Sequence, residues 1–260
     1  MINSGDNAMN KSIWQFAFGM QAVDGLEPSE YILHLIEAHN PCFDEFEKME
    51  LLVKDFYAEK ESVDRQYECD MVALHMAEYC MNIVPGKVEM YAEKMLQTDV
   101  LKKIHRKLFG EVFDFAGMFR KYNISKDEPV LGGQSIKYAD YMRIEDYLRY
   151  DFAEEQKQCY TDKNLEEVIS RISKFSSHIW QIHAFMEGNT RTVAVYMTEY
   201  LYCLGYAIDW EYFGNNAVEF RNALVKANYA DYTTGIQADT TALEGFWRNA
   251  IQTNCQREIS

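Results

Sequence analysis

Apolar residues recur at helical spacing through much of the second half of the chain. One stripe runs from Leu165 to Ile179, and a second runs from Val193 to Leu204, each with an apolar residue every three or four positions. Between them lies QIHAFMEGNTRTVAV, residues 181–195, and Gly205 follows the second stripe. This pattern predicts two helices joined by a tight turn.

Other segments extend the helical pattern to most of the chain. The segments with helical composition are residues 27–39, 43–84, 98–115, 216–229 and 240–252, with a break expected at Pro85-Gly86. Residues 116–141 contain glycines, a proline and β-branched residues, which predict a loop with a short hairpin near Gly132-Gly133. The expected fold class is all-α with one short β-hairpin.

Composition narrows the function classes. The 260 residues carry a net charge of −15, which disfavours binding to nucleic-acid backbones. The chain has no apolar run of about eighteen residues, so no membrane span is expected. Residues 1–12 lack a signal-peptide core, and the six scattered cysteines contain no CxxC pair. We expect a cytoplasmic protein with reduced cysteines, while secretion as an effector stays open.

The turn between the two stripes concentrates polar residues with complementary chemistry. A helix N-terminus there would present free N–H groups to an anion, and Gly188 permits a positive φ. Arg191 is a bidentate phosphate donor, Glu187 can hold magnesium through phosphates, and His183 can act as a base. Each residue alone has an ordinary structural interpretation, such as a helix cap for Asn189. Together they predict a phosphate-binding site with a proton acceptor.

The stretch HAFMEGNTRTVA, residues 183–194, resembles the motif of the Fic family (filamentation induced by cAMP), His-x-Phe-x-Asp/Glu-Gly-Asn-Gly-Arg-x-x-Arg. Residues 101–126 and 220–229 look like the segments that flank this motif in the family. The resemblance implies a Fic-fold helical bundle with a hairpin flap over the active site. It divides the chain into an N-terminal helical region, residues 1–95, with a regulatory or antitoxin-like role, and a Fic domain, residues 96–260.

The resemblance also implies an activity, because most Fic proteins transfer AMP from ATP to a hydroxyl of a target protein. His183 would deprotonate the Ser, Thr or Tyr of the target, and Glu187 would bind Mg²⁺. A flap over residues 130–138 would pair with the target backbone. The remaining motif residues would hold the phosphates: Gly188, Asn189, Thr190 and Arg191.

Two motif positions depart from the family pattern. Thr190 replaces a glycine, and Ala194 replaces a second arginine that contacts the γ-phosphate. Lys137 in the flap is a candidate replacement for that arginine, while Arg120 and Lys126 either face the nucleotide or pair with acids. Two alternatives therefore remain open: a degenerate Fic fold that binds nucleotide or a partner without turnover, and a Fic transferase with another phosphate-containing donor.

Two segments resemble the inhibitory segments of Fic proteins, including those of toxin–antitoxin pairs. TTALEG offers Glu244, and AVDGLEPSE near the N-terminus offers Asp24 in place of a glutamate. An ordinary amphipathic helix is the alternative for both. The N-terminal helices could cover the active site or form the surface of a homo-oligomer.

Overall fold

The computed structural model describes residues 4–39, 45–58, 60, 64–83, 92–161 and 163–252. Most of these residues are helical. The helices before the motif are α1 (Ser4–Ala22), α2 (Glu30–His39), α3 (Phe46–Ala58), α4 (Asp64–Asn82), α5 (Ala92–Met95), α6 (Thr98–Phe109), α7 (Ile144–Gln156) and α8 (Leu165–Ile182). After it come α9 (Asn189–Cys203), α10 (Trp210–Asn215), α11 (Ala217–Ala227) and α12 (Thr241–Ala250). Short 3₁₀ turns are η1 (Pro129–Leu131) and η2 (Tyr141–Arg143).

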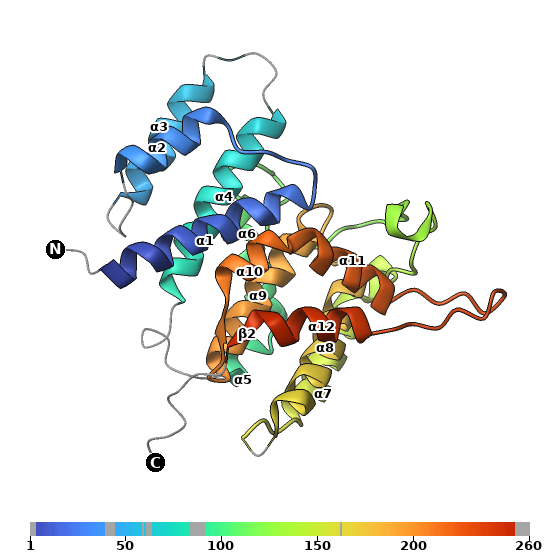
Figure 1. Ribbon diagram of the computed structural model, residues 1–260. Helices are drawn as coiled ribbons and strands as arrows, with labels where there is room; N and C mark the ends of the chain where they lie inside the picture. Colours follow the sequence, from blue (N-terminus) through green and yellow to red (C-terminus); the bar gives the residue numbers. More distant parts are fainter. Residues whose placement is uncertain are drawn as a thin grey trace.

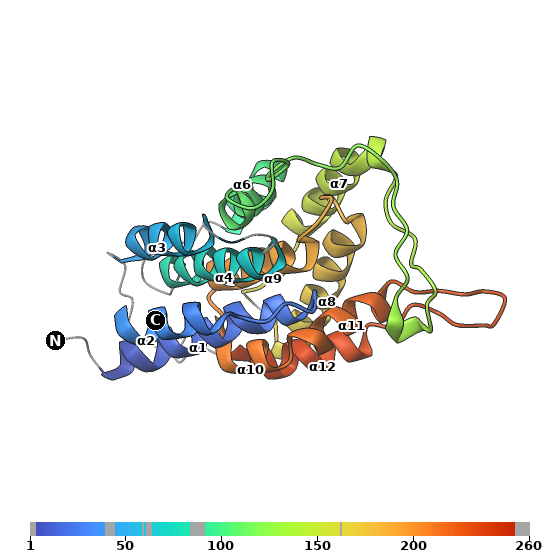
Figure 2. The same ribbon diagram turned by 90° about the horizontal axis from the view of Figure 1, so that it is seen from above.

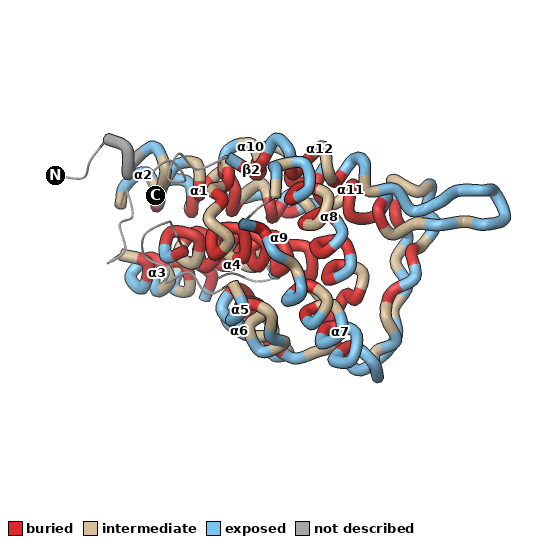
Figure 3. The backbone as a smooth tube through the Cα atoms, turned by 90° about the horizontal axis from the view of Figure 1, so that it is seen from below, coloured by how far each residue is buried: buried red, intermediate tan, exposed pale blue. Residues whose placement is uncertain are grey.

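Helix α9 forms the centre of the fold. Every residue of α9 except Glu199 is buried, and α4, α6 and α8 pack around the helix (Figure 3). A helix that is apolar on all sides is stable only when neighbours cover each of its faces. The motif at its N-terminus is therefore held by the most buried element of the protein.

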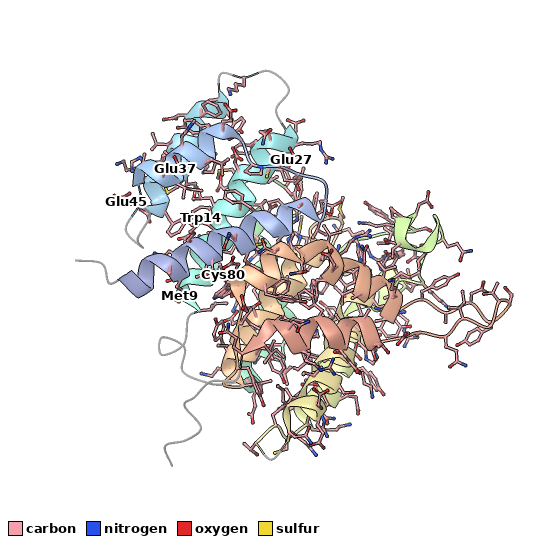
Figure 4. The ribbon with its side chains drawn as sticks, viewed as in Figure 1. Met9, Trp14, Glu27, Glu37, Glu45 and Cys80 are labelled. Atoms are coloured by element: carbon pink, nitrogen blue, oxygen red, sulfur yellow. The ribbon has the colours of Figure 1, made fainter. Side chains whose placement is uncertain are left out.

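The N-terminal helices belong to the same core. Helix α1 lies against α10 and α4 (Figure 1). A Cβ on Gly19 would lie 2.1 Å from the carbonyl oxygen of Gly214, so the two glycines let the backbones of α1 and α10 touch. On the other side of α1, the Trp14 ring stacks on Phe46 of α3, with centroids 6.2 Å apart (Figure 4). One apolar cluster thus extends from Ile13 to Ile251.

The two helices predicted around the motif are confirmed. Helix α8 begins with a capping box in which the side chain of Asn164 accepts from the N–H of Glu167, and the Glu167 side chain accepts from Asn164. Helices α1 and α7 were not predicted individually, and the described residues within 43–84 form two helices, α3 and α4. The expected break at Pro85-Gly86 lies outside the described residues.

The last predicted helix is shorter than expected. It ends at Ala250 because Ile251 turns to an extended conformation, with φ −83° and ψ 120°. Strand β2 (Ile251–Gln252) then pairs antiparallel with β1 (Ala207–Ile208). Likewise the helix expected over residues 98–115 ends at Phe109, where the N–H of Gly110 bonds to Arg106.

The predicted hairpin is present at the end of the molecule beside α11 (Figure 2). A single bridge joins Glu128 to Gln134, and Gly132 and Gly133 have φ of 66° and 89°. We call residues 128–138 the flap. Among the described residues, no helix is long and apolar enough to cross a membrane.

Candidate active site

Two left-handed residues shape the loop between α8 and α9. His183 ends α8 with φ 49° and is the non-glycine residue with positive φ in the described part of the chain. Gly188 begins α9 with φ 74°, and a Cβ there would lie 2.4 Å from the Phe109 ring. Position 188 therefore requires glycine for both conformation and space.

His183 has the properties of a proton acceptor. Its ring is buried and packs against Tyr138, with centroids 4.5 Å apart, and against Trp180, at 5.6 Å. Neither ring nitrogen has a hydrogen-bond partner in the structure. Burial, with the nearby charge of Lys126, holds the pKa of His183 well below its ordinary value. The imidazole is therefore neutral.

The Arg120 side chain holds the loop between α8 and α9 by hydrogen bonds to backbone carbonyl groups. Its Nε donates to the carbonyl oxygen of His183 at 2.8 Å, and its terminal nitrogens donate to carbonyls of Tyr122 and Ala139. The Arg120 main chain donates to Ala184 at 2.9 Å. Of the two alternatives given for Arg120, facing a nucleotide or pairing with acids, the structure shows neither, because its guanidinium binds carbonyl groups.

Asn189 and Thr190 also serve the shape of the loop. The amide of Asn189 accepts from the Phe185 N–H and donates to the Phe185 carbonyl, both at 2.9 Å. The Thr190 hydroxyl accepts from the indole N–H of Trp180 at 2.9 Å. The departure from glycine at position 190 thus provides an acceptor for a buried donor, which would otherwise be costly.

Both the side chain and the backbone carbonyl of Glu187 make hydrogen bonds. Its carboxylate accepts from the N–H of Gly188 at 2.9 Å, and its carbonyl oxygen is 3.0 Å from Nε2 of His105. The other ring nitrogen of His105 accepts from the Gly117 N–H at 2.9 Å, so the proton of the neutral ring lies on Nε2. Burial lowers the pKa of His105 to about 4.

The motif opens into a very small cavity of about 20 Å³. This volume suffices for about one water molecule. Carboxylates and cations from distant elements share it with the motif. The lining residues are Asp24, Lys126, Glu128, Trp180, His183, Glu187, Asn189, Thr190 and Arg221.

Arg191 does not line this cavity and lies in a buried ion-pair cluster. Its Nε lies 2.9 Å from Asp24, one terminal nitrogen lies 2.7 Å from Glu68, and the other donates to Gln21 at 2.9 Å. The guanidinium also lies over the Phe109 ring, 4.8 Å from its centroid. Arg191 thereby ties α9 to α4 and to the end of α1.

The inhibitory candidates lie in different surroundings. Asp24 lines the cavity and pairs with Arg191. Position 194 cannot offer such a pairing, because the methyl side chain of Ala194 carries no charge. Glu244 accepts a hydrogen bond from Thr240 within α12 and is not among the lining residues.

Lys137 lies beside a second pocket. That pocket has a volume of about 640 Å³ and is bordered by Tyr138, Tyr147, Tyr150 and other residues of α7, α8 and the flap. Lys126 and Arg221 are the cations that line the small cavity instead. Sequence reasoning missed Arg221, which lies in the downstream block that resembles the family.

Glu187 fits a magnesium ion bound through phosphates. Among the described residues, no group of three or more His, Cys, Asp or Glu side chains is arranged to hold a metal. Mg²⁺ commonly takes one or two carboxylates and completes its shell with water and substrate phosphates. A single carboxylate beside the N-terminus of α9 matches that donor set.

The sequence matches known proteins over this same region. A model of the Fic/DOC family matches residues 95–201. The chain is 31% identical over 160 residues to the protein adenylyltransferase VbhT of Bartonella schoenbuchensis. That alignment covers 55% of this chain but only 31% of VbhT, so the chain spans about a third of this relative.

Solved structures show the same fold. The N-terminal Fic domain of Bep8, a VirB-translocated effector of Bartonella sp. 1-1C, superposes with a TM-score of 0.56 at 15% identity, covering 78% of this chain and 91% of that one. The Fic domain of a VirB-translocated Bep effector of Bartonella quintana gives 0.52 at 16% identity, covering 75% and 87%. The match to the Fic/DOC family model thus covers the motif and most of the buried helix α9.

Proposed function

We propose that the protein transfers AMP from ATP to a Ser, Thr or Tyr hydroxyl of a target protein. The observation that carries this proposal is the buried, neutral and unpartnered imidazole of His183, in one cavity with Glu187 and the N-terminus of α9. The 31% identity to a protein adenylyltransferase supports the choice of donor.

The residues suggest a division of labour. His183 accepts the proton of the target hydroxyl. The hydroxyl oxygen attacks the α-phosphorus of ATP, and pyrophosphate leaves. The N–H group of Thr190 and the α9 dipole stabilise the phosphoryl charge. Glu187 would hold Mg²⁺, which neutralises phosphate charge when bound. Arg120 acts on His183 through the backbone, so we treat it as a positioning residue.

The cavity is too small for a nucleotide in this conformation, which supports a closed state. A nucleotide cannot enter a cavity of about 20 Å³ unless lining side chains move. Asp24, just after the end of α1, lines this cavity, and its side chain is 33% exposed. We therefore propose a regulatory role for the N-terminal region, with Asp24 as the inhibitory residue. The two alternatives, nucleotide binding without turnover and a different donor, remain outcomes of the test below.

The test is incubation with Mg²⁺ and α-labelled ATP, alone and with a bacterial lysate, for the intact chain and the Asp24→Ala variant. We expect a labelled protein band that His183→Ala abolishes. His178→Ala is the matched control, because His178 lies on the same helix with a side chain 58% exposed. If no variant labels a protein although ATP binds, the Fic domain is non-catalytic; if ATP does not bind, another donor is required.

A further inference from the structure

Arg221 reaches the active-site cavity from α11 and meets a buried carboxylate. A terminal nitrogen of Arg221 lies 2.6 Å from Glu128, whose side chain is fully buried at the base of the flap. The Tyr138 hydroxyl donates to the other oxygen of Glu128 at 2.9 Å. Since the Tyr138 ring packs against His183, this cluster connects α11, the flap and the proposed base.

The cavity needs a cation that the motif does not supply. Position 194 is alanine, and Arg191 is engaged by Asp24 and Glu68. Lys137 borders the second pocket. Arg221 lines the cavity together with His183 and keeps 21% side-chain exposure, so it is accessible without unfolding of the core.

We propose that Arg221 binds the phosphate chain of the nucleotide in place of the missing motif arginine, and that Glu128 holds this guanidinium while the site is closed. The inference rests on the proposed function for the identity of the donor. A guanidinium presents the same fork of N–H donors to a carboxylate and to a phosphate, so the two anions compete for it. Binding exchanges the Glu128 contact for a phosphate contact.

The test is a titration by calorimetry of three ligands: Mg-ATP, tripolyphosphate and adenosine. Each is titrated into the intact chain and into the Asp24→Ala background, with Arg221→Gln or Glu128→Gln added. Arg221→Gln removes one charge-assisted contact, so we expect the Kd of ATP and of tripolyphosphate to rise about tenfold or more. The Kd of adenosine should change by less than about twofold. Glu128→Gln should tighten both phosphate ligands, because Arg221 loses its competing anion.

The two variants separate a ligand-binding role from a structural one. If Arg221 serves only to neutralise Glu128, both substitutions weaken binding equally or change nothing, and the proposal is wrong. Absence of phosphate binding in every variant would overturn it as well. Arg248→Gln is the control, because Arg248 makes an exposed ion pair with Glu166, and neither residue lines the cavity.

Failure of the proposed function gives a different result. Tripolyphosphate binding that depends on Arg221, without labelling from ATP, keeps the phosphate site and rejects adenylyl transfer. Labelling that is unchanged by Arg221→Gln keeps the transfer and rejects the role of Arg221.

Discussion

At the residue scale, His105 is a buried base whose two ring nitrogens are both used. Nδ1 accepts from Gly117 and Nε2 lies against the carbonyl of Glu187, so a second proton would break the Gly117 bond. The ring also stacks on Phe185, with centroids 3.9 Å apart. Protonation of His105 should therefore disturb the loop that carries Glu187.

This coupling predicts acid sensitivity of the fold. With a folded pKa of about 4 against 6.5 when unfolded, the unfolded chain binds more protons in that interval, so stability falls as pH drops from 6.5 to 4. The loss is at most about 3 kcal/mol from His105. Urea unfolding followed by circular dichroism gives the free energy of unfolding at several pH values. The slope of this free energy against pH should be smaller for His105→Asn than for the wild type. His178→Asn should keep the wild-type slope, and equal slopes for all three proteins would contradict the prediction.

At the element scale, the end of α1 and the turn after it contact the motif through Arg191. The turn after Ala22 is closed by the N–H groups of Asp24 and Leu26, which bond to the carbonyl of Gln21. Gln21 and Asp24 both bind Arg191, while Glu68 holds it from α4. Removal of Asp24 would leave Arg191 with two partners and would open one wall of the cavity.

We therefore expect Asp24→Ala to increase binding of Mg-ATP and, where transfer occurs, labelling of protein. An effect of roughly 3- to 10-fold is reasonable, because a partly exposed pair contributes only about 1 kcal/mol. Calorimetry and the labelling assay give the two readouts. Glu27→Ala, three residues further along the same segment, is the control. Unchanged affinity and labelling in Asp24→Ala would show that this segment does not restrict the site.

The sequence predicted helices whose apolar residues recur at regular spacing. It did not predict side-chain positions that depend on contacts between residues far apart in the sequence. Helices α8 and α9 have clear apolar stripes, and His183 and Glu187 of the motif between them line one cavity. Arg191 was expected at the phosphates, but its orientation depends on Asp24 and Glu68, which lie more than a hundred positions away. Arg221 could be recognised only once α11 was placed beside the flap.

At the scale of the whole molecule, the N-terminal region completes the core that supports α9. Phe16 of α1 packs edge-on against Trp210 and Phe213 of α10, with centroids 5.1 and 4.9 Å apart. Glu68 and Asp24 neutralise the fully buried Arg191. A buried charge that loses its partners is strongly destabilising. The region therefore contributes stability as well as the proposed inhibition.

We therefore expect that residues 96–260 alone will not fold stably. Removal of residues 1–95 would expose the apolar face of α10 and leave Arg191 without either carboxylate, so we expect loss of the near-ultraviolet circular dichroism signal and of a cooperative urea transition. The intact chain should unfold in one transition, because its core is continuous. A chain that lacks only residues 1–7 is the control and should retain the signal. A cooperative transition in residues 96–260 would instead show that these residues are an independent folding unit, which does not need the N-terminal helices for its stability.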